Sequence, residues 1–252
     1  MYINGYVIPV PEGSKDKYRA MSEIFWDHAK EKGALEQVEA WESDVPDGKV
    51  TDFRRAVDLK DGEKVVFSWL AWPDKATAKA FEAQDMELIM SDPRMKELGE
   101  DMPFDGRRMI FGGFEPIVDE GKAGGGYVDG FIVPVPNGKR EAYRKMAASA
   151  AKVFLEFGAT RDVEGWGVDV PEGKVTDFQR AVKAEDEETV VFSFLEWPDE
   201  ETRNEGWKKV MADERMNALG KDAPFDGQRM FWGGFMPIVN ERAAQARAPE
   251  HA

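Results

Sequence analysis

The spacing of hydrophobic and polar residues predicts one series of elements that occurs twice. From Tyr2 to Val10 apolar residues alternate with others, as in a β-strand. From Tyr18 to His28 they recur three and four residues apart, as on one face of a helix. Two further strands are expected at about Ala34–Glu42 and Val65–Leu70, a second helix with Asp74 as its N-cap, and a last strand at Arg108–Val118. The predicted order is β-α-β-β-α-β.

The chain repeats this unit. Residues 2–73 align with residues 127–198 without a gap, and residues 90–118 align with residues 211–239 after a loss of four residues. The joint between the copies is rich in glycine, as in flexible linkers. We therefore predict a first repeat over residues 1–120, a linker over 121–126, a second repeat over 127–241 and a disordered tail over 242–252.

The order of elements predicts an α+β fold. It is the ferredoxin-like plan, in which an antiparallel sheet carries both helices on one face. The other face needs a cover, and two copies in one chain offer one. We expect two tandem ferredoxin-like units packed sheet to sheet as an intramolecular dimeric α/β barrel around a pseudo-two-fold axis. The alternative is two separate units that each dimerise with another chain.

Composition limits the partners. The formal net charge is −15 and both halves are acidic, which argues against nucleic acid, since its binding needs clustered positive charge. There is no cysteine, which excludes disulfides and argues against a structural zinc site. The N-terminus lacks the pattern of a signal peptide and no apolar run is long enough to span a membrane, so a cytoplasmic protein without a membrane partner is expected.

Several motifs together resemble a known family. They include Tyr2–Tyr6, Asp44–Phe53, Val65–Trp69, Ser91–Met95 and the segment from Pro103 to Phe114, and nearly all recur in the second copy. With these motifs the chain resembles a tandem version of the YbaA-like bacterial family, a domain-of-unknown-function family in the dimeric α/β-barrel superfamily. Its members usually have one unit, so the resemblance implies that the usual homodimer forms within one chain. It implies a fold and no established activity.

More distant relatives in that superfamily include cofactor-free oxygenases, haem-degrading oxygenases, lactone isomerases and chlorite-dismutase-like haem enzymes. Their haem chemistry generally relies on a histidine. This chain has only His28, on the apolar stripe of the first helix, and His251, in the predicted tail. The carboxylates show no metal-ligand spacing. We therefore expect no cofactor and no metal.

The copies agree most in two segments. In the first, Asp44–Phe53 matches Asp169–Phe178, but the V-P-x-G part occurs four times in the chain and is typical of a reusable turn. What needs explanation is Lys49–Phe53 and its copy. Thr51 and Asp52 either cap the local backbone or line a site. Arg55 can pair with Asp52 if this segment forms a helical turn, whereas in a strand the two side chains would face opposite ways. The second segment, Pro103–Val118, matches Pro224–Val239, and ahead of it Asp92 is expected to cap a short helix.

These segments supply candidate site residues in matched pairs. Asp52 is a candidate acid–base group, and Arg94 and Arg108 could hold developing negative charge or form structural ion pairs. The catalytic candidates are Asp52, Asp177, Arg94, Arg215, Arg108 and Arg229. The binding candidates are Trp41, Trp166, Lys49, Lys174, Thr51, Thr176, Phe104 and Phe225.

Three functions remain open at this point. The first is a cofactor-free enzyme, of oxygenase or isomerase type, acting on a small organic molecule in a cavity walled by Trp41, Trp69 and Phe104. The second is a non-catalytic module that binds a small molecule, anionic if the arginines contact it. The third is a protein-interaction or structural role. Whether the protein is an enzyme, and whether it oligomerises beyond the internal pseudo-dimer, is not decided by the sequence.

Overall fold

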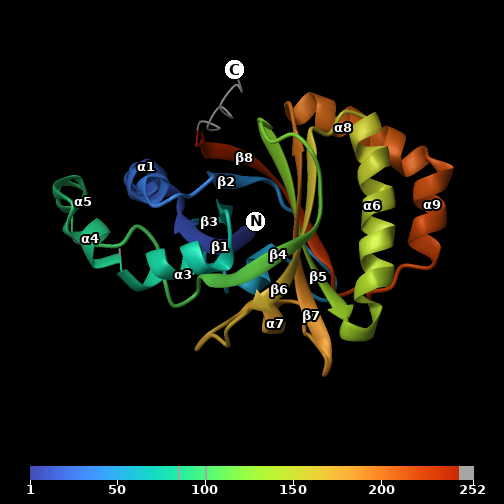
Figure 1. Ribbon diagram of the computed structural model, residues 1–252, viewed down its shortest axis with the longest axis horizontal. Coiled ribbons are helices and arrows are strands. Elements are labelled where there is room, and N and C mark those ends of the chain that lie inside the picture. The colour runs from blue at the N-terminus through green and yellow to red at the C-terminus, as the bar shows by residue number, and fades with distance from the viewer. Residues whose placement is uncertain (85, 100, 244–252) are drawn as a thin grey trace, which may run out of the picture.

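Eight antiparallel strands close into one barrel in the computed structural model, which describes residues 1–84, 86–99 and 101–243 (Figure 1). The strands are β1 (Tyr2–Pro11), β2 (Glu36–Asp44), β3 (Glu63–Trp72), β4 (Ile110–Gly121), β5 (Tyr127–Pro136), β6 (Arg161–Asp169), β7 (Glu188–Trp197) and β8 (Phe231–Arg242). Around the barrel they run in the order β1-β3-β2-β8-β5-β7-β6-β4, and β4 pairs with β1. A closed barrel leaves no unpaired strand edge.

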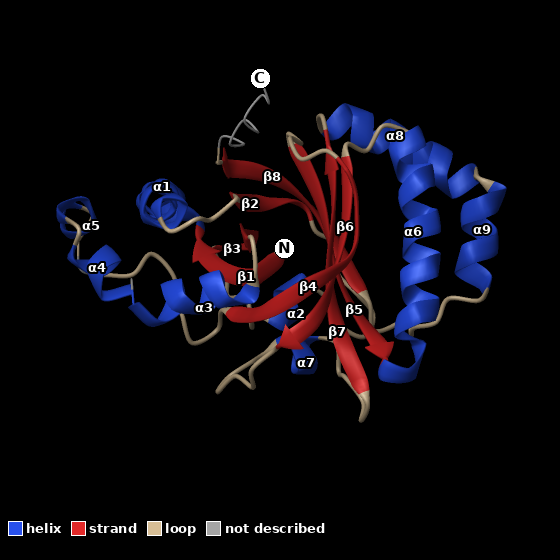
Figure 2. Cartoon of the chain, in the orientation of Figure 1, coloured by secondary structure: helices blue, strands red, loops and turns tan. Residues whose placement is uncertain are grey.

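Helices cover the outside of the barrel in two groups (Figure 2). The first half supplies α1 (Lys15–Glu31), α3 (Lys75–Gln84), α4 (Met86–Ser91) and α5 (Pro93–Glu97), and the second supplies α6 (Arg140–Glu156), α8 (Glu200–Ala212) and α9 (Glu214–Lys221). The short helices α2 (Phe53–Ala56) and α7 (Phe178–Ala181) contact each other at one end of the barrel. In the described part of the chain, no helix has both the length and the apolar character of a membrane span.

The α+β class and the closed barrel agree with the sequence prediction. Each half contributes four neighbouring strands, and the halves join where β2 pairs with β8 and β4 pairs with β6. The alternative of two separate units is therefore wrong for this chain. Asp92 and Asp74 cap their helices as expected, since their side chains accept the amides of Arg94 and Thr77. The last nine residues of the predicted tail, 244–252, lie outside the described residues.

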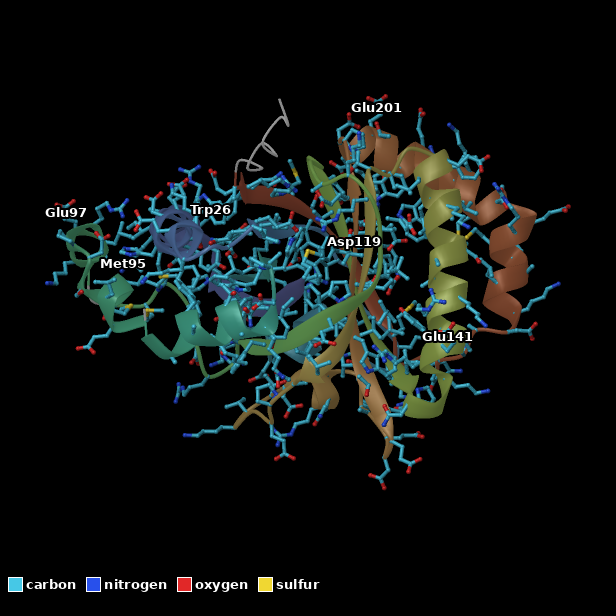
Figure 3. All side chains as sticks on the ribbon, in the orientation of Figure 1. Trp26, Met95, Glu97, Asp119, Glu141 and Glu201 are labelled. Atoms are coloured by element: carbon cyan, nitrogen blue, oxygen red, sulfur yellow. The ribbon has the colours of Figure 1, made fainter. Side chains whose placement is uncertain are left out.

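Aromatic rings from both halves fill the barrel interior, whose dense side chains are drawn in Figure 3. Phe67 of β3 stacks on Phe192 of β7 with ring centroids 4.5 Å apart, and Trp69 stacks on Phe194 at 4.0 Å. Each pair joins equivalent positions of the two repeats, so the pseudo-two-fold axis passes between these rings. An eight-stranded barrel is just wide enough for its side chains to fill. The interior is a packed core.

Two equivalent glycines make room for the central stack. A Cβ atom at Gly5 would lie 2.8 Å from the ring of Phe192, and one at Gly130 would lie 2.8 Å from the ring of Phe67. Glycine at these positions lets a ring from the other half lie against the strand backbone. The close approach explains why both copies keep glycine in the middle of their first strand.

A buried ion network also crosses the axis. Arg161 of β6 donates to both carboxylate oxygens of Glu36 on β2, at 2.9 and 3.0 Å, and to Asp119 and Glu196. Glu36 and Arg161 occupy equivalent positions of the two repeats. A homodimer of either unit would bring two like charges together here, whereas the tandem chain brings opposite charges together.

The most similar segment of the two repeats closes one end of the barrel. The hydroxyl of Thr51 donates to the carbonyl of Ala181 at 2.5 Å, and Thr176 donates to the carbonyl of Ala56 at 2.6 Å. The ring of Phe53 lies edge-on to Phe231 and Phe235 of the other half. Each copy of the segment therefore binds the opposite half, which is a structural reason for its identity in both repeats.

The glycine contacts lead to a prediction about stability. Gly5→Ala and Gly130→Ala should each lower the free energy of unfolding by about 1–3 kcal/mol, because the added methyl group overpacks the central stack. Gly13→Ala and Gly138→Ala are matched controls, since a Cβ there meets nothing within 4 Å. Urea unfolding of the four variants measures the difference. Equal losses in variants and controls would contradict the close approach.

Candidate functional site

Two equivalent pockets lie between the outer face of the barrel and the helices. The first, of about 210 Å³, is bounded by β1, β2 and β3, by α1, and by α4 and α5, where Met95 is labelled in Figure 3. The second, also about 210 Å³, is bounded by β5, β6 and β7 and by α6 and α9. An apolar cavity of about 150 Å³ accommodates benzene, so each pocket has room for a small ring compound.

Each pocket has a buried carboxyl group at its floor. Glu39 of β2 accepts a hydrogen bond from the Tyr18 hydroxyl of α1 at 2.5 Å, and Ser68 lies opposite it on β3. In the second pocket Glu164 of β6 accepts from the Tyr143 hydroxyl of α6 at 2.7 Å, and Ser193 lies opposite on β7. The amphipathic helix delivers the tyrosine and the alternation of the strand points the glutamate outward toward it.

Burial gives both carboxyl groups an unusual proton affinity. Removal from water raises the pKa of Glu39 to about 7, although the hydrogen bonds from Tyr18, Ser68 and Gln37 act in the opposite direction. Burial likewise raises the pKa of Glu164 to about 7. Burial and the neighbouring carboxylate raise the pKa of Tyr18 and Tyr143 well above the ordinary value, so both phenols stay protonated and donate. A carboxyl group that titrates near neutral pH suits general acid–base catalysis.

The rest of each pocket is largely apolar. Five methionines line the first, and Met146, Met216 and Met230 line the second. Phe104 lies edge-on to Tyr18 with centroids 5.8 Å apart, and Phe225 lies in the same way against Tyr143. Of the binding residues predicted from the sequence, Phe104 and Phe225 are thus pocket residues. Apolar walls around a few polar groups are typical of small-molecule sites.

Asp52 and Asp177 lie away from these pockets. The carboxylate of Asp52 caps α2: Oδ1 accepts the amide of Arg55 at 2.7 Å, Oδ2 accepts the amide of Gly48 at 3.1 Å, and the Arg55 guanidinium lies 3.2 Å away. Asp177 makes the same contacts with Arg180 and Gly173. These contacts satisfy the carboxylates locally, as expected of a cap.

The predicted arginines form ion pairs on the helices and loops. Half-exposed Arg94 of α5 pairs with Asp92 and with Asp27 of α1, and Arg215 pairs with Asp213 and Glu156. Arg108 binds both oxygens of Glu63, at 2.7 and 2.6 Å.

Arg229 binds Glu188 in the same way. None of these arginines lines either pocket. The structure therefore does not bring Asp52, Arg94 and Arg108 together around a shared cavity.

The remaining candidates are spread over the surface and the core. Trp41 and Trp166 are buried beside the pockets, under Lys15 and Arg140, while Lys49 and Lys174 are exposed. Thr51 and Thr176 serve the contact between the halves. Trp69 lies inside the barrel, so it does not wall a cavity with Trp41 and Phe104.

Sequence reasoning missed the two tyrosine–glutamate pairs, although a signal was present. The first helix differs at most positions between the copies, yet Tyr18 is retained as Tyr143, and Glu39 and Ser68 are retained as Glu164 and Ser193. A charged residue at a buried strand position is rarely without a partner. In the described residues, no group of three or more His, Cys, Asp or Glu side chains is placed to hold a metal ion.

The fold and these pockets define a class: an α+β closed-barrel protein with one acid-containing pocket in each half. A family model described as "Protein of unknown function (DUF1428)" matches residues 1–106 and 126–227. The chain belongs to this family.

Curated relatives have one unit. The "Uncharacterized protein YbaA" of Escherichia coli K12 is 57% identical over 115 residues, which cover 46% of this chain and 98% of that protein. The protein of the same name in Shigella flexneri matches equally well. The resemblance noted in the sequence is thus confirmed.

Solved structures share the fold at low sequence identity. A "Putative monooxygenase" from Fusobacterium nucleatum superposes with a TM-score of 0.59 at 9% identity, covering 96% of this chain and 94% of that one. A protein of Lactobacillus acidophilus with the same description gives 0.57 at 10%, covering 96% and 95%. An "anthrone oxidase-like protein" gives 0.50 at 10%, covering 97% and 94%.

The contacts of Asp52 and Asp177 lead to a test of their role. Asp52→Ala and Asp177→Ala should each lower the free energy of unfolding by about 0.5–2 kcal/mol, the usual cost of a lost helix cap, and should leave ligand binding in the pockets unchanged. Urea unfolding measures the change in stability, and calorimetry with a pocket ligand measures the binding affinity. A folded double variant that no longer binds a pocket ligand would instead support a role of these residues in the site, as predicted from the sequence.

The raised pKa of Glu39 predicts a dependence of stability on pH. Between about pH 4.5 and 7 the folded state keeps the proton that the unfolded state has lost, so the folded state binds more protons and stability falls as pH rises. Relative to Glu39→Gln, the wild-type protein should lose on the order of 1–3 kcal/mol across this window. Urea unfolding at several pH values provides the comparison. If the free energy of unfolding changed with pH in the same way in both proteins, the raised pKa of Glu39 would be contradicted.

Proposed function

We propose that each pocket binds a small, mostly apolar organic molecule and that Glu39 and Glu164 exchange a proton with it. The observation that carries this proposal is the pair of buried carboxyl groups, each hydrogen-bonded to a tyrosine and each with a pKa of about 7. Near neutral pH such a group is ionised in part of the molecules, and it accepts a proton more strongly than an exposed carboxylate does.

The neighbouring residues orient the acid–base group. Tyr18 and Ser68 hold the carboxylate of Glu39 from the helix and strand sides, and Tyr143 and Ser193 do the same for Glu164. The apolar walls exclude water from the reacting atoms and strengthen the electrostatic interactions between them. The substrate best suited to this arrangement has an acidic C–H or O–H group next to a carbonyl or an aromatic ring.

The shared fold favours a cofactor-free oxygenation as the reaction. Glu39 takes a proton from an activated CH₂ group, and the electron pair left on carbon reduces dioxygen while a C–O bond forms. The returned proton completes a hydroperoxide, which loses water and leaves a ketone. Substrate and dioxygen thus become ketone and water, and the substrate supplies all the electrons. The solved structures described as "Putative monooxygenase" and "anthrone oxidase-like protein" support this class. Isomerisation through the same proton transfer is the variant without dioxygen.

We also infer that the two halves correspond to the subunits of a dimeric α/β barrel, each a ferredoxin-like unit. The equal strand order in the halves and the stacking of equivalent rings across the axis support this inference. The match of one YbaA protein to about half of this chain supports it as well. Each pocket then belongs to one unit.

A binding module without chemistry is the second candidate. Five methionines line the first pocket, and methionine-rich surfaces are typical of sites that adapt to several ligands. On this alternative Glu39 and Glu164 would give hydrogen-bonding specificity only.

The deciding experiment measures turnover in variants of the two carboxyl groups. The wild-type protein is incubated in air with anthrone and with smaller enolisable ketones and phenols, and oxygen uptake and products are followed by electrode and mass spectrometry. The double variant Glu39→Gln/Glu164→Gln should lose about 10²–10⁴-fold in rate, because general base catalysis is gone. Each single variant should keep one working pocket.

Glu141→Gln is the matched control, since it changes an exposed glutamate on α6. Full activity in the double variant would overturn the catalytic role. Binding of the probes by the wild-type protein without any turnover would favour the binding module.

A further inference from the structure

The two pockets differ in their polar groups although they share the tyrosine–glutamate pair. Gln37 of the first pocket is replaced by Asp162 in the second, Tyr6 by Phe131, and Ser22 by Ala147. The second pocket therefore loses two hydroxyl groups and gains a second carboxyl group.

Asp162 lies next to Glu164 in the floor of the pocket. The two residues are two positions apart on β6, so their side chains point to the same face of the sheet. Both side chains line the pocket, and Asp162 is only 2% exposed. The strand thus presents a pair of buried carboxyl groups where the first half presents a carboxyl and an amide.

The carboxylate of Asp162 is not satisfied by its surroundings. Within the described part of the chain its Oδ1 atom is buried and has no hydrogen-bond partner. The equivalent Gln37 also has a buried oxygen without a partner, Oε1, but its amide donates through Nε2 to the carbonyl of Ser22 at 2.9 Å and to Glu39 at 3.2 Å, whereas Asp162 has no donor to offer Glu164 when both are ionised. A buried acceptor without a donor is costly, so a ligand that brings a donor to this point is favoured.

The charges around the pair are also negative. Burial and the proximity of Glu164 raise the pKa of Asp162 well above its usual range, and Asp119 and Glu120 add to the effect. Burial and mutual repulsion therefore disfavour two negative charges on the pair. A positively charged group that enters the pocket relieves this repulsion.

The walls of the second pocket suit an organic cation. Phe131, Tyr143, Phe154 and Phe225 line it. Aromatic rings attract an ammonium group through their faces and pack against its hydrocarbon part. A bare metal ion fits less well, because a hard divalent cation needs about six oxygen ligands and this pair supplies only two side chains.

We propose that the second pocket selects a small organic ammonium compound through Asp162 and Glu164, whereas the first pocket binds a neutral molecule. The inference rests on the proposed function only in taking both pockets as small-molecule sites. Duplication within one chain has then produced two sites with different ligand charge, which a homodimer of one unit cannot have.

The test uses 2-phenylethylamine as the cationic probe and 2-phenylethanol as its neutral counterpart. Isothermal titration calorimetry on the full chain gives affinity and stoichiometry. The wild-type protein should bind one 2-phenylethylamine per chain, more tightly than 2-phenylethanol by about tenfold or more, as expected for a charge-assisted contact. Asp162→Gln should remove this preference.

The first pocket provides the reciprocal variant. Gln37→Asp creates the carboxyl pair there and should raise the stoichiometry for 2-phenylethylamine from one to two. Asp162→Asn keeps the volume of the side chain and replaces Asp162→Gln in the test if that variant does not fold. Thermal unfolding shows whether each variant is folded. In Asp162→Glu the cation preference should survive, which a merely structural role for Asp162 does not require.

The possible failures are distinguishable. If 2-phenylethanol binds but 2-phenylethylamine binds no better, or if Asp162→Gln and Asp162→Asn leave the preference intact, the inference is overturned and the proposed function stands. If neither probe binds the wild-type protein at millimolar concentration, the inference is overturned and the pockets lose their support as ligand sites as well.

Discussion

The stacking of Phe67 on Phe192 and of Trp69 on Phe194 is the contact on which the rest of the molecule depends. These rings come from opposite halves and fill the barrel, so neither half can bury its inner sheet face without the other. Because the interior is full, the two pockets that contain a buried glutamate lie on the outer face of the barrel, under the helices. Outward-facing residues of the barrel strands, among them Glu39 of β2 and Glu164 of β6, form the floors of the two pockets.

Placing both units in one chain removes the requirement that equivalent positions be identical. In a homodimer a residue next to the two-fold axis meets its own copy, and like charges at such a position repel each other. Here Glu36 meets Arg161 close to the axis, and the next pair of positions along the strands holds Gln37 and Asp162. The same freedom therefore stabilises the join between the halves and allows the two pockets to differ.

Agreement between the repeats indicated structural roles more reliably than chemical ones. Thr51, Asp52 and Phe53 are retained because they bridge the halves, cap a helix and fill the end of the barrel. Tyr18 was visible as an unchanged residue in a variable helix, yet its importance depends on Glu39, which lies on another element. Phe104 could be predicted as a pocket residue because an aromatic side chain in a loop that both repeats retain is expected either in the core or in a binding site.

Local patterns in the sequence determined the order of strands and helices, the helix caps at Asp74 and Asp92, and the repeat that makes a self-contained barrel. Each of these depends on residues close together in the chain or on a period that the sequence displays. Only the tertiary structure decided where the pockets lie and which residues carry chemistry. The proton affinity of Glu39 arises from burial beneath α1 and from the hydroxyl of Tyr18, and both depend on how distant segments pack against the same face of the sheet.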